Sequence, residues 1–106
     1  MSKTDINYEN LANAVVEQVA RDYRRAICRY HNAKTEEGRK RYKDEMDILE
    51  RWFTGDDIKV YTRLDGTALM NGIKQQCAEN NYDLTKIRRS LAVFRKKLES
   101  REEVEP

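Results

Sequence analysis

The pattern that most constrains the fold is a long run of apolar side chains at helical spacing near the start of the chain. They recur every three or four residues, at Tyr8, Leu11, Val15, Val19, Tyr23, Ala26 and Tyr30. This spacing lies on one face of an α-helix, so we predict one long helix over residues 7–33. The only proline of the chain is Pro106. Helices before it must therefore end through glycine, asparagine or aspartate chemistry.

A second helix is predicted over residues 36–53. Thr35 can serve as its N-cap, and acidic side chains at Glu36 and Glu37 suit the positive end of the helix dipole. The short connection makes the two helices antiparallel neighbours. At its end, Trp52 and Phe53 cannot both point fully inward, so one aromatic edge is expected to be exposed.

The segment after this helix and the residues that follow it contain three glycines as turn signals in an otherwise helical chain, Gly55, Gly66 and Gly72. Gly55 is expected at positive φ as a helix C-cap, and the apolar spacing of Ile58, Tyr61 and Leu64 predicts a short helix. A strand is the less favoured alternative, because no second strand would pair with it.

The Asp65-Gly66 pair is the second turn signal. We expect Thr67 to cap a third helix that runs to about Glu79. The three structural turn residues of the predicted bend are Gly55, Asp65 and Gly66.

A last helix is predicted after Asn80, capped by Asn81 or Asp83. Its apolar residues step by three and four positions, as in a coiled-coil seam, at Leu84, Ile87, Leu91, Phe94 and Leu98. This seam can close the bundle within one chain or join two copies as a homodimer, and the sequence leaves both alternatives open.

Together these patterns predict an all-α fold, a small helical bundle made of a long antiparallel helical hairpin and two or three shorter helices. The 106 residues fit a single domain, 1–106. Residues 1–6 and 100–106 are expected to be disordered. The chain has neither a signal-peptide pattern nor an apolar run of about 20 residues, so we expect no membrane span and a cytoplasmic location.

No catalytic or metal-binding motif stands out. Cys28 and Cys77 lie in separate helical patterns without zinc-ligand spacing, and we expect both to be reduced and buried. His31, the only histidine, falls at a predicted helix end and is expected to be structural. We therefore expect no catalytic residue, no metal site, no cofactor and no enzymatic activity.

The formal net charge of +2 hides separate charged blocks that are candidate binding surfaces. An acidic face for a protein partner is predicted at Asp44, Asp47, Glu50, Asp56 and Asp57. A basic face for a protein partner or nucleic acid is predicted at Arg88, Arg89, Arg95 and Lys96. The alternative for both is a solvated surface whose charges are balanced by neighbouring residues.

Several short segments resemble small uncharacterised helical proteins carried by prophages and integrative elements of Gram-positive bacteria. They are the stretches 14–18 (AVVEQ), 22–26 (DYRRA), 48–54 (ILERWFT) and 64–66 (LDG). The final helix after Asn80 departs from that pattern. The resemblance implies a phage or mobile-element accessory protein in a bacterial host cell, and it implies no activity.

Two functions follow as expectations. The first is a non-catalytic accessory protein that binds a host or phage protein, which includes inhibition of a host CRISPR nuclease. The alternative is a nucleic-acid-binding accessory or regulatory protein that uses the basic C-terminal helix. Segregated charge without a chemical site motivates the first, and the basic C-terminal helix motivates the second.

Overall fold

The computed structural model describes residues 2–91, and its account of side chains covers residues 11–91. The described elements are α1 (Ser2–Asn32), α2 (Glu36–Thr54), the 3₁₀ helix η1 (Ile58–Val60) and α3 (Gly66–Glu79). A further helical segment follows at 84–91. Within these residues the fold is an all-α bundle without strands, which confirms the predicted fold class.

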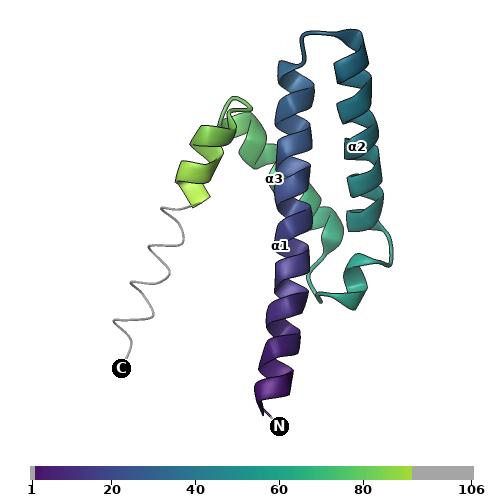
Figure 1. Cartoon of the computed structure of the whole chain (residues 1–106), viewed down its shortest axis with the longest axis vertical. Coiled ribbons are helices and arrows are strands. Elements are labelled where there is room, and N and C mark those ends of the chain that lie inside the picture. The colour runs from purple at the N-terminus through teal and green to yellow at the C-terminus, as the bar shows by residue number, and fades with distance from the viewer. Residues whose placement is uncertain (1, 92–106) are drawn as a thin grey trace.

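The first two helices form the predicted antiparallel hairpin and lie side by side (Figure 1). α1 begins at Ser2, earlier than the predicted start at residue 7, so residues 2–6 belong to the helix. The predicted cap of α2 is confirmed, because the Thr35 hydroxyl accepts a hydrogen bond of 3.0 Å from the Gly38 N–H. Glu36 and Glu37 occupy the first turn of α2 as expected.

The third helix packs across the hairpin and contacts both α1 and α2 (Figure 1). Its cap differs from the prediction. The Asp65 carboxylate accepts hydrogen bonds from the N–H groups of Thr67 (2.9 Å) and Ala68 (3.3 Å), so Asp65 is the N-cap and Thr67 is already inside the helix. An aspartate two positions earlier satisfies the free N–H groups that Thr67 was expected to satisfy.

Gly55 and Gly66 lie where a larger residue would clash with the backbone. Gly55 caps α2 at φ −92, so the predicted positive φ is wrong. A Cβ on Gly55 would lie 2.8 Å from the Arg51 carbonyl oxygen, and one on Gly66 would overlap the Phe53 carbonyl oxygen. The start of α3 therefore approaches the end of α2 so closely that a side chain at residue 66 has no room.

A tight turn leads from α3 into the last helical segment. Asn81 and Tyr82 adopt positive φ values of 55 and 56, and the Tyr82 N–H donates to the Cys77 carbonyl over 2.8 Å. Asp83 then caps segment 84–91 by accepting from the Thr85 N–H over 2.9 Å. Of the two caps left open by the sequence, Asp83 is the one used.

The core lies where α1, α2, α3 and segment 84–91 meet. Tyr23 and Phe53 are its largest side chains, with ring centroids 5.4 Å apart. Ile87 is 1% exposed and belongs to this core, with Leu84 and Leu91 packed beside it. Of the three described residues of the predicted seam, Ile87 is thus buried within the chain, whereas Leu84 and Leu91 are partly buried. Phe94, Leu98 and the terminal stretch 100–106 lie outside the described residues.

Candidate functional site

An exposed apolar cluster lies at the bend between α2 and α3. We call it the bend patch, and its residues are Trp52, Val60, Tyr61 and Leu64. Val60 is 65% exposed, Leu64 62% and Tyr61 36%. The Tyr61 ring stacks near Trp52, with centroids 6.0 Å apart and planes inclined by 28°. Large apolar side chains exposed close together in the chain, as here, are a common feature of interaction sites.

The local backbone explains why these side chains are outside. The helix predicted from the spacing of Ile58, Tyr61 and Leu64 ends at Val60, so only Ile58 of the three is buried. Phe53 is buried while Trp52 is half-buried, which gives the exposed aromatic edge that the sequence predicted. Beside the patch, Leu64, Lys59 and Arg63 help to line an open hollow of about 590 Å³.

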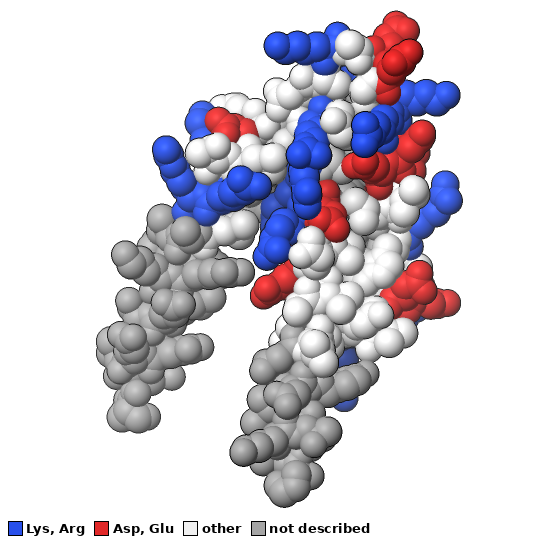
Figure 2. All heavy atoms as spheres, in the orientation of Figure 1, with Lys and Arg blue, Asp and Glu red and all other residues white. Residues whose placement is uncertain are grey.

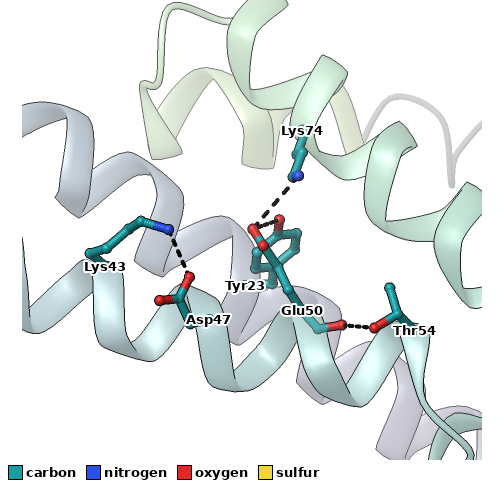
Figure 3. A network of polar contacts seen from close by, with 6 residues as sticks. All are labelled: Tyr23, Lys43, Asp47, Glu50, Thr54 and Lys74. Atoms are coloured by element: carbon teal, nitrogen blue, oxygen red, sulfur yellow. Dashed lines mark hydrogen bonds and ion pairs between the residues drawn. The ribbon is translucent and has the colours of Figure 1, made fainter.

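The five predicted acidic residues do not share one face. The Glu50 carboxylate is half-buried and accepts a 2.7 Å hydrogen bond from the Tyr23 hydroxyl, while Lys74 approaches it to 3.7 Å (Figure 3). Asp47 pairs with Lys43 at 2.7 Å in the same view. Glu50 of α2 therefore contacts side chains of both α1 and α3.

The remaining predicted acids are at the surface. Asp56 pairs with Lys59 at 3.1 Å, and Asp44 and Asp57 are exposed. Asp44 lies within α2, whereas Asp56 and Asp57 follow its end. The predicted acidic face is thus divided between α2 and the residues after its end, with Asp47 and Asp56 each paired to a lysine.

Basic side chains gather over α1 and segment 84–91, as Figure 2 shows in blue. Arg88 and Arg89 of the predicted basic face are exposed. Arg95 and Lys96 lie outside the described residues. Arg24 of α1 donates from Nε to the Gln76 side chain of α3 over 2.8 Å.

A groove separates α1 from segment 84–91. It has a volume of about 500 Å³ and is lined by Val16, Glu17, Ala20, Arg21, Arg24, Arg25, Leu84, Ile87, Arg88 and Leu91. Sequence reasoning missed this groove, because its two walls lie far apart in the chain. The alternation of Arg and apolar residues in both walls was visible, but only the tertiary structure shows that they face a common space.

The two thiols are brought together in the core. Cys28 and Cys77 are buried and free, as predicted. Burial, followed by the neighbouring Cys28, raises the pKa of Cys77 to about 12, and burial also raises the pKa of Cys28. Both thiols are protonated at neutral pH, and a protonated thiol is a poor nucleophile and metal ligand.

The single histidine takes part in an aromatic contact. His31 stacks on Tyr82 with ring centroids 3.6 Å apart and planes inclined by 11°. Next to it, Asn32 donates from Nδ2 to the carbonyl oxygens of Cys28 and Tyr82 over 2.8 and 3.0 Å. These contacts hold the turn after α3 against the end of α1. His31 thus has a structural contact, as the sequence suggested.

Within residues 11–91 no group of three or more His, Cys, Asp or Glu side chains is arranged to hold a metal ion. No helix in the described part of the chain is both long enough and apolar enough to cross a bilayer. Comparisons with protein families, with curated proteins and with solved structures find no match to this chain. The resemblance to prophage proteins stays a prediction.

Proposed function

We propose that this chain is a non-catalytic accessory protein of a phage or integrative element, and that it acts in the bacterial cytoplasm by binding a host or phage protein. The observation that carries the proposal is the bend patch. Its half-buried Trp52 and exposed Tyr61 are of the residue types that dominate binding energy at protein interfaces. The close approach at Gly66 anchors the bend to the end of α2, which reduces the ordering that binding requires.

Affinity capture from lysate of a Gram-positive bacterium tests this proposal. Wild-type protein is compared with the double variant Tyr61→Ala/Leu64→Ser, and the matched control is Ile48→Ser, which changes an aliphatic side chain 63% exposed elsewhere. We expect a protein that is retained by the wild type and the control, and whose affinity falls at least about tenfold for the double variant. Equal retention by all three proteins would exclude the bend patch as the binding surface.

Inhibition of a CRISPR nuclease is the specific form of this function that the prophage resemblance suggests. A reconstituted nuclease supplies the test, with target-DNA binding and cleavage measured at increasing protein concentration. We expect cleavage to fall with the wild type and to recover with Tyr61→Ala/Leu64→Ser. Unchanged cleavage at excess protein rejects this role for the nuclease tested.

Nucleic-acid binding is the second candidate, favoured by the basic side chains gathered over α1 and segment 84–91 (Figure 2). Phosphate contacts make affinity fall steeply with salt. The expected result is a gel shift at low salt that Arg88→Glu/Arg89→Glu abolishes. Absence of a shift for duplex and single-stranded DNA and RNA at low salt removes this candidate.

A further inference from the structure

The groove between α1 and segment 84–91 has an apolar floor. Ile87 is 1% exposed at its base and Ala20 is 9% exposed. Val16, Leu84 and Leu91 are partly buried around them. Apolar side chains of an occupant would cover the exposed apolar surface that remains, chiefly that of the three partly buried residues, which is favourable in proportion to the area covered.

Arginines rim the same groove on both sides. Arg21, Arg24 and Arg25 stand on α1, and Arg88 stands on segment 84–91. Arg21 and Arg24 donate to the uncharged amide oxygens of Gln18 and Gln76, whereas Arg25 pairs with Asp22 at 2.7 Å. Glu17 is the one carboxylate among the residues that line the groove, so the lining carries a clear excess of positive charge.

The apolar floor and the arginine rim together indicate which kind of partner the groove would bind. Grooves between two helices are a known binding mode for an amphipathic helix, whose apolar residues at i, i+3, i+4 and i+7 would contact the floor. The arginine rim favours aspartate and glutamate on the flanks of that helix through charge complementarity. A nucleic-acid backbone would satisfy the arginines but would leave the apolar floor uncovered. The apolar floor therefore favours protein over nucleic acid.

We propose that this groove binds an acidic amphipathic helix of a partner protein. It is a second interaction surface, which shares no residue with the bend patch and does not depend on it. The floor contributes apolar contact to the affinity, and the arginines of the rim orient the helix and select acidic flanks.

Designed peptides of about 18 residues, or five helical turns, test the proposal on the full chain. The first has a leucine stripe flanked by glutamates, the second replaces the glutamates by lysines, and the third keeps the glutamates but replaces the leucines by serines. Fluorescence anisotropy at about 150 mM salt limits long-range charge effects. We expect micromolar binding of the first peptide, and at least about tenfold weaker binding of the other two.

Protein variants locate the binding. Arg21→Glu/Arg88→Glu is expected to weaken binding of the first peptide at least about tenfold. Arg39→Glu/Lys40→Glu makes the same change in net charge at exposed positions of α2 and should leave the affinity within about twofold. Tyr61→Ala/Leu64→Ser should also leave it unchanged. Because the groove variant and the bend-patch variant change different surfaces, the experiment distinguishes a groove that does not bind from a bend patch that does not bind.

Four results would overturn the proposal. The first is no peptide binding, and the second is preferential binding of a DNA oligonucleotide that is lost in Arg21→Glu/Arg88→Glu. A dimer in light scattering that the same variant dissociates would assign the groove to a second copy. Peptide binding only after Glu102→Lys/Glu103→Lys would assign it to the acidic end of the chain itself.

Discussion

At the scale of single residues, the contact between Tyr23 and Glu50 links a half-buried carboxylate to the core. Tyr23 is buried in α1, and its hydroxyl donates to the Glu50 carboxylate of α2. Lys74 of α3 completes the link at 3.7 Å (Figure 3). A buried hydroxyl without an acceptor is costly, so Glu50 supports the core more directly than it supports an acidic binding face.

Tyr23→Phe tests this link. The change keeps the aromatic ring against Phe53 but removes the donor to Glu50, so we expect the free energy of unfolding to fall by about 1–2 kcal/mol. Urea unfolding followed by circular dichroism measures it. Tyr30→Phe, which keeps the ring edge against His31, is the control and should change stability by less than about 0.5 kcal/mol. Equal stability of Tyr23→Phe and wild type would contradict the structural role of Glu50.

Gly66 and Gly72 both lie in α3 but differ in the space around them, so that the same substitution at each can be compared. Gly66→Ala places a Cβ onto the Phe53 carbonyl oxygen, whereas nothing lies within 4 Å of a Cβ at Gly72. We expect Gly66→Ala to destabilise the fold by at least about 2 kcal/mol. Gly72→Ala should stabilise it by about 0.5–1 kcal/mol, because alanine favours the helix. Thermal unfolding of both variants decides this, and a tolerated Gly66→Ala would mean that α3 can move away from α2.

At the scale of elements, the helices begin and end through short polar side chains. Thr35, Asp65 and Asp83 each accept a hydrogen bond from a backbone N–H of the helix that follows. The first four N–H groups of a helix have no partner within the helix, and without a cap they would depend on water. With no proline before Pro106, these caps and the turns between them decide where each helix stops.

The cap of α3 gives a prediction at this scale. Asp65→Ala removes the acceptor of two N–H groups and should cost about 1 kcal/mol of stability, whereas Asp65→Asn should restore most of it. Thr67→Ala should change stability by less than about 0.5 kcal/mol, because Thr67 is a helical residue and not the cap. Chemical unfolding ranks the three variants. A larger loss for Thr67→Ala than for Asp65→Ala would reverse the assignment.

At the scale of the whole molecule, one core ties all helical elements together. Tyr23 and Cys28 come from α1, Phe53 from α2, Cys77 from α3, and Ile87 from segment 84–91. Because these side chains share one apolar space, the unfolding of one element exposes the others, and small domains of this kind usually unfold cooperatively.

Alkaline pH should destabilise this core as a whole. Burial raises the pKa of Cys77 to about 12 from an ordinary 9.0, and burial together with Glu50 raises the pKa of Tyr23. The unfolded chain then loses these protons first, so stability is complete below about pH 9 and falls as pH rises toward 12. Between the pKa of a group in the unfolded chain and its pKa in the folded chain, the free energy of unfolding falls by about 1.4 kcal/mol per pH unit.

Urea unfolding between about pH 8 and pH 11 measures this fall. Cys77→Ala removes the contribution of that thiol and keeps that of Cys28, so the stability of the variant should decline less steeply from its own starting value. Both cysteines should also resist thiol reagents in the native state, since they are buried and protonated at neutral pH. A wild-type stability that is flat with pH over this range is the contrary result.

The sequence alone determined the helical class, the hairpin and most helix boundaries to within one or two residues. These features rest on local information. Apolar side chains repeat with the period of the helix, and short polar residues cap the N–H groups next to them in the chain. The Thr35 cap was predicted for this reason, and Asp83 was one of the two caps that the sequence left open. The start of α1 and the Asp65 cap were mistaken, because terminal turns lack a strong periodic signal.

Only the tertiary structure decided which surfaces these helices leave open. It placed the Glu50 carboxylate against the Tyr23 hydroxyl, left Tyr61 and Leu64 exposed, and brought Arg21 and Arg88 to the lining of one groove. Each outcome depends on contacts between residues distant in the chain, for which a single sequence has no periodic signal. The candidate binding surfaces are products of packing, whereas the helices that carry them are products of local sequence.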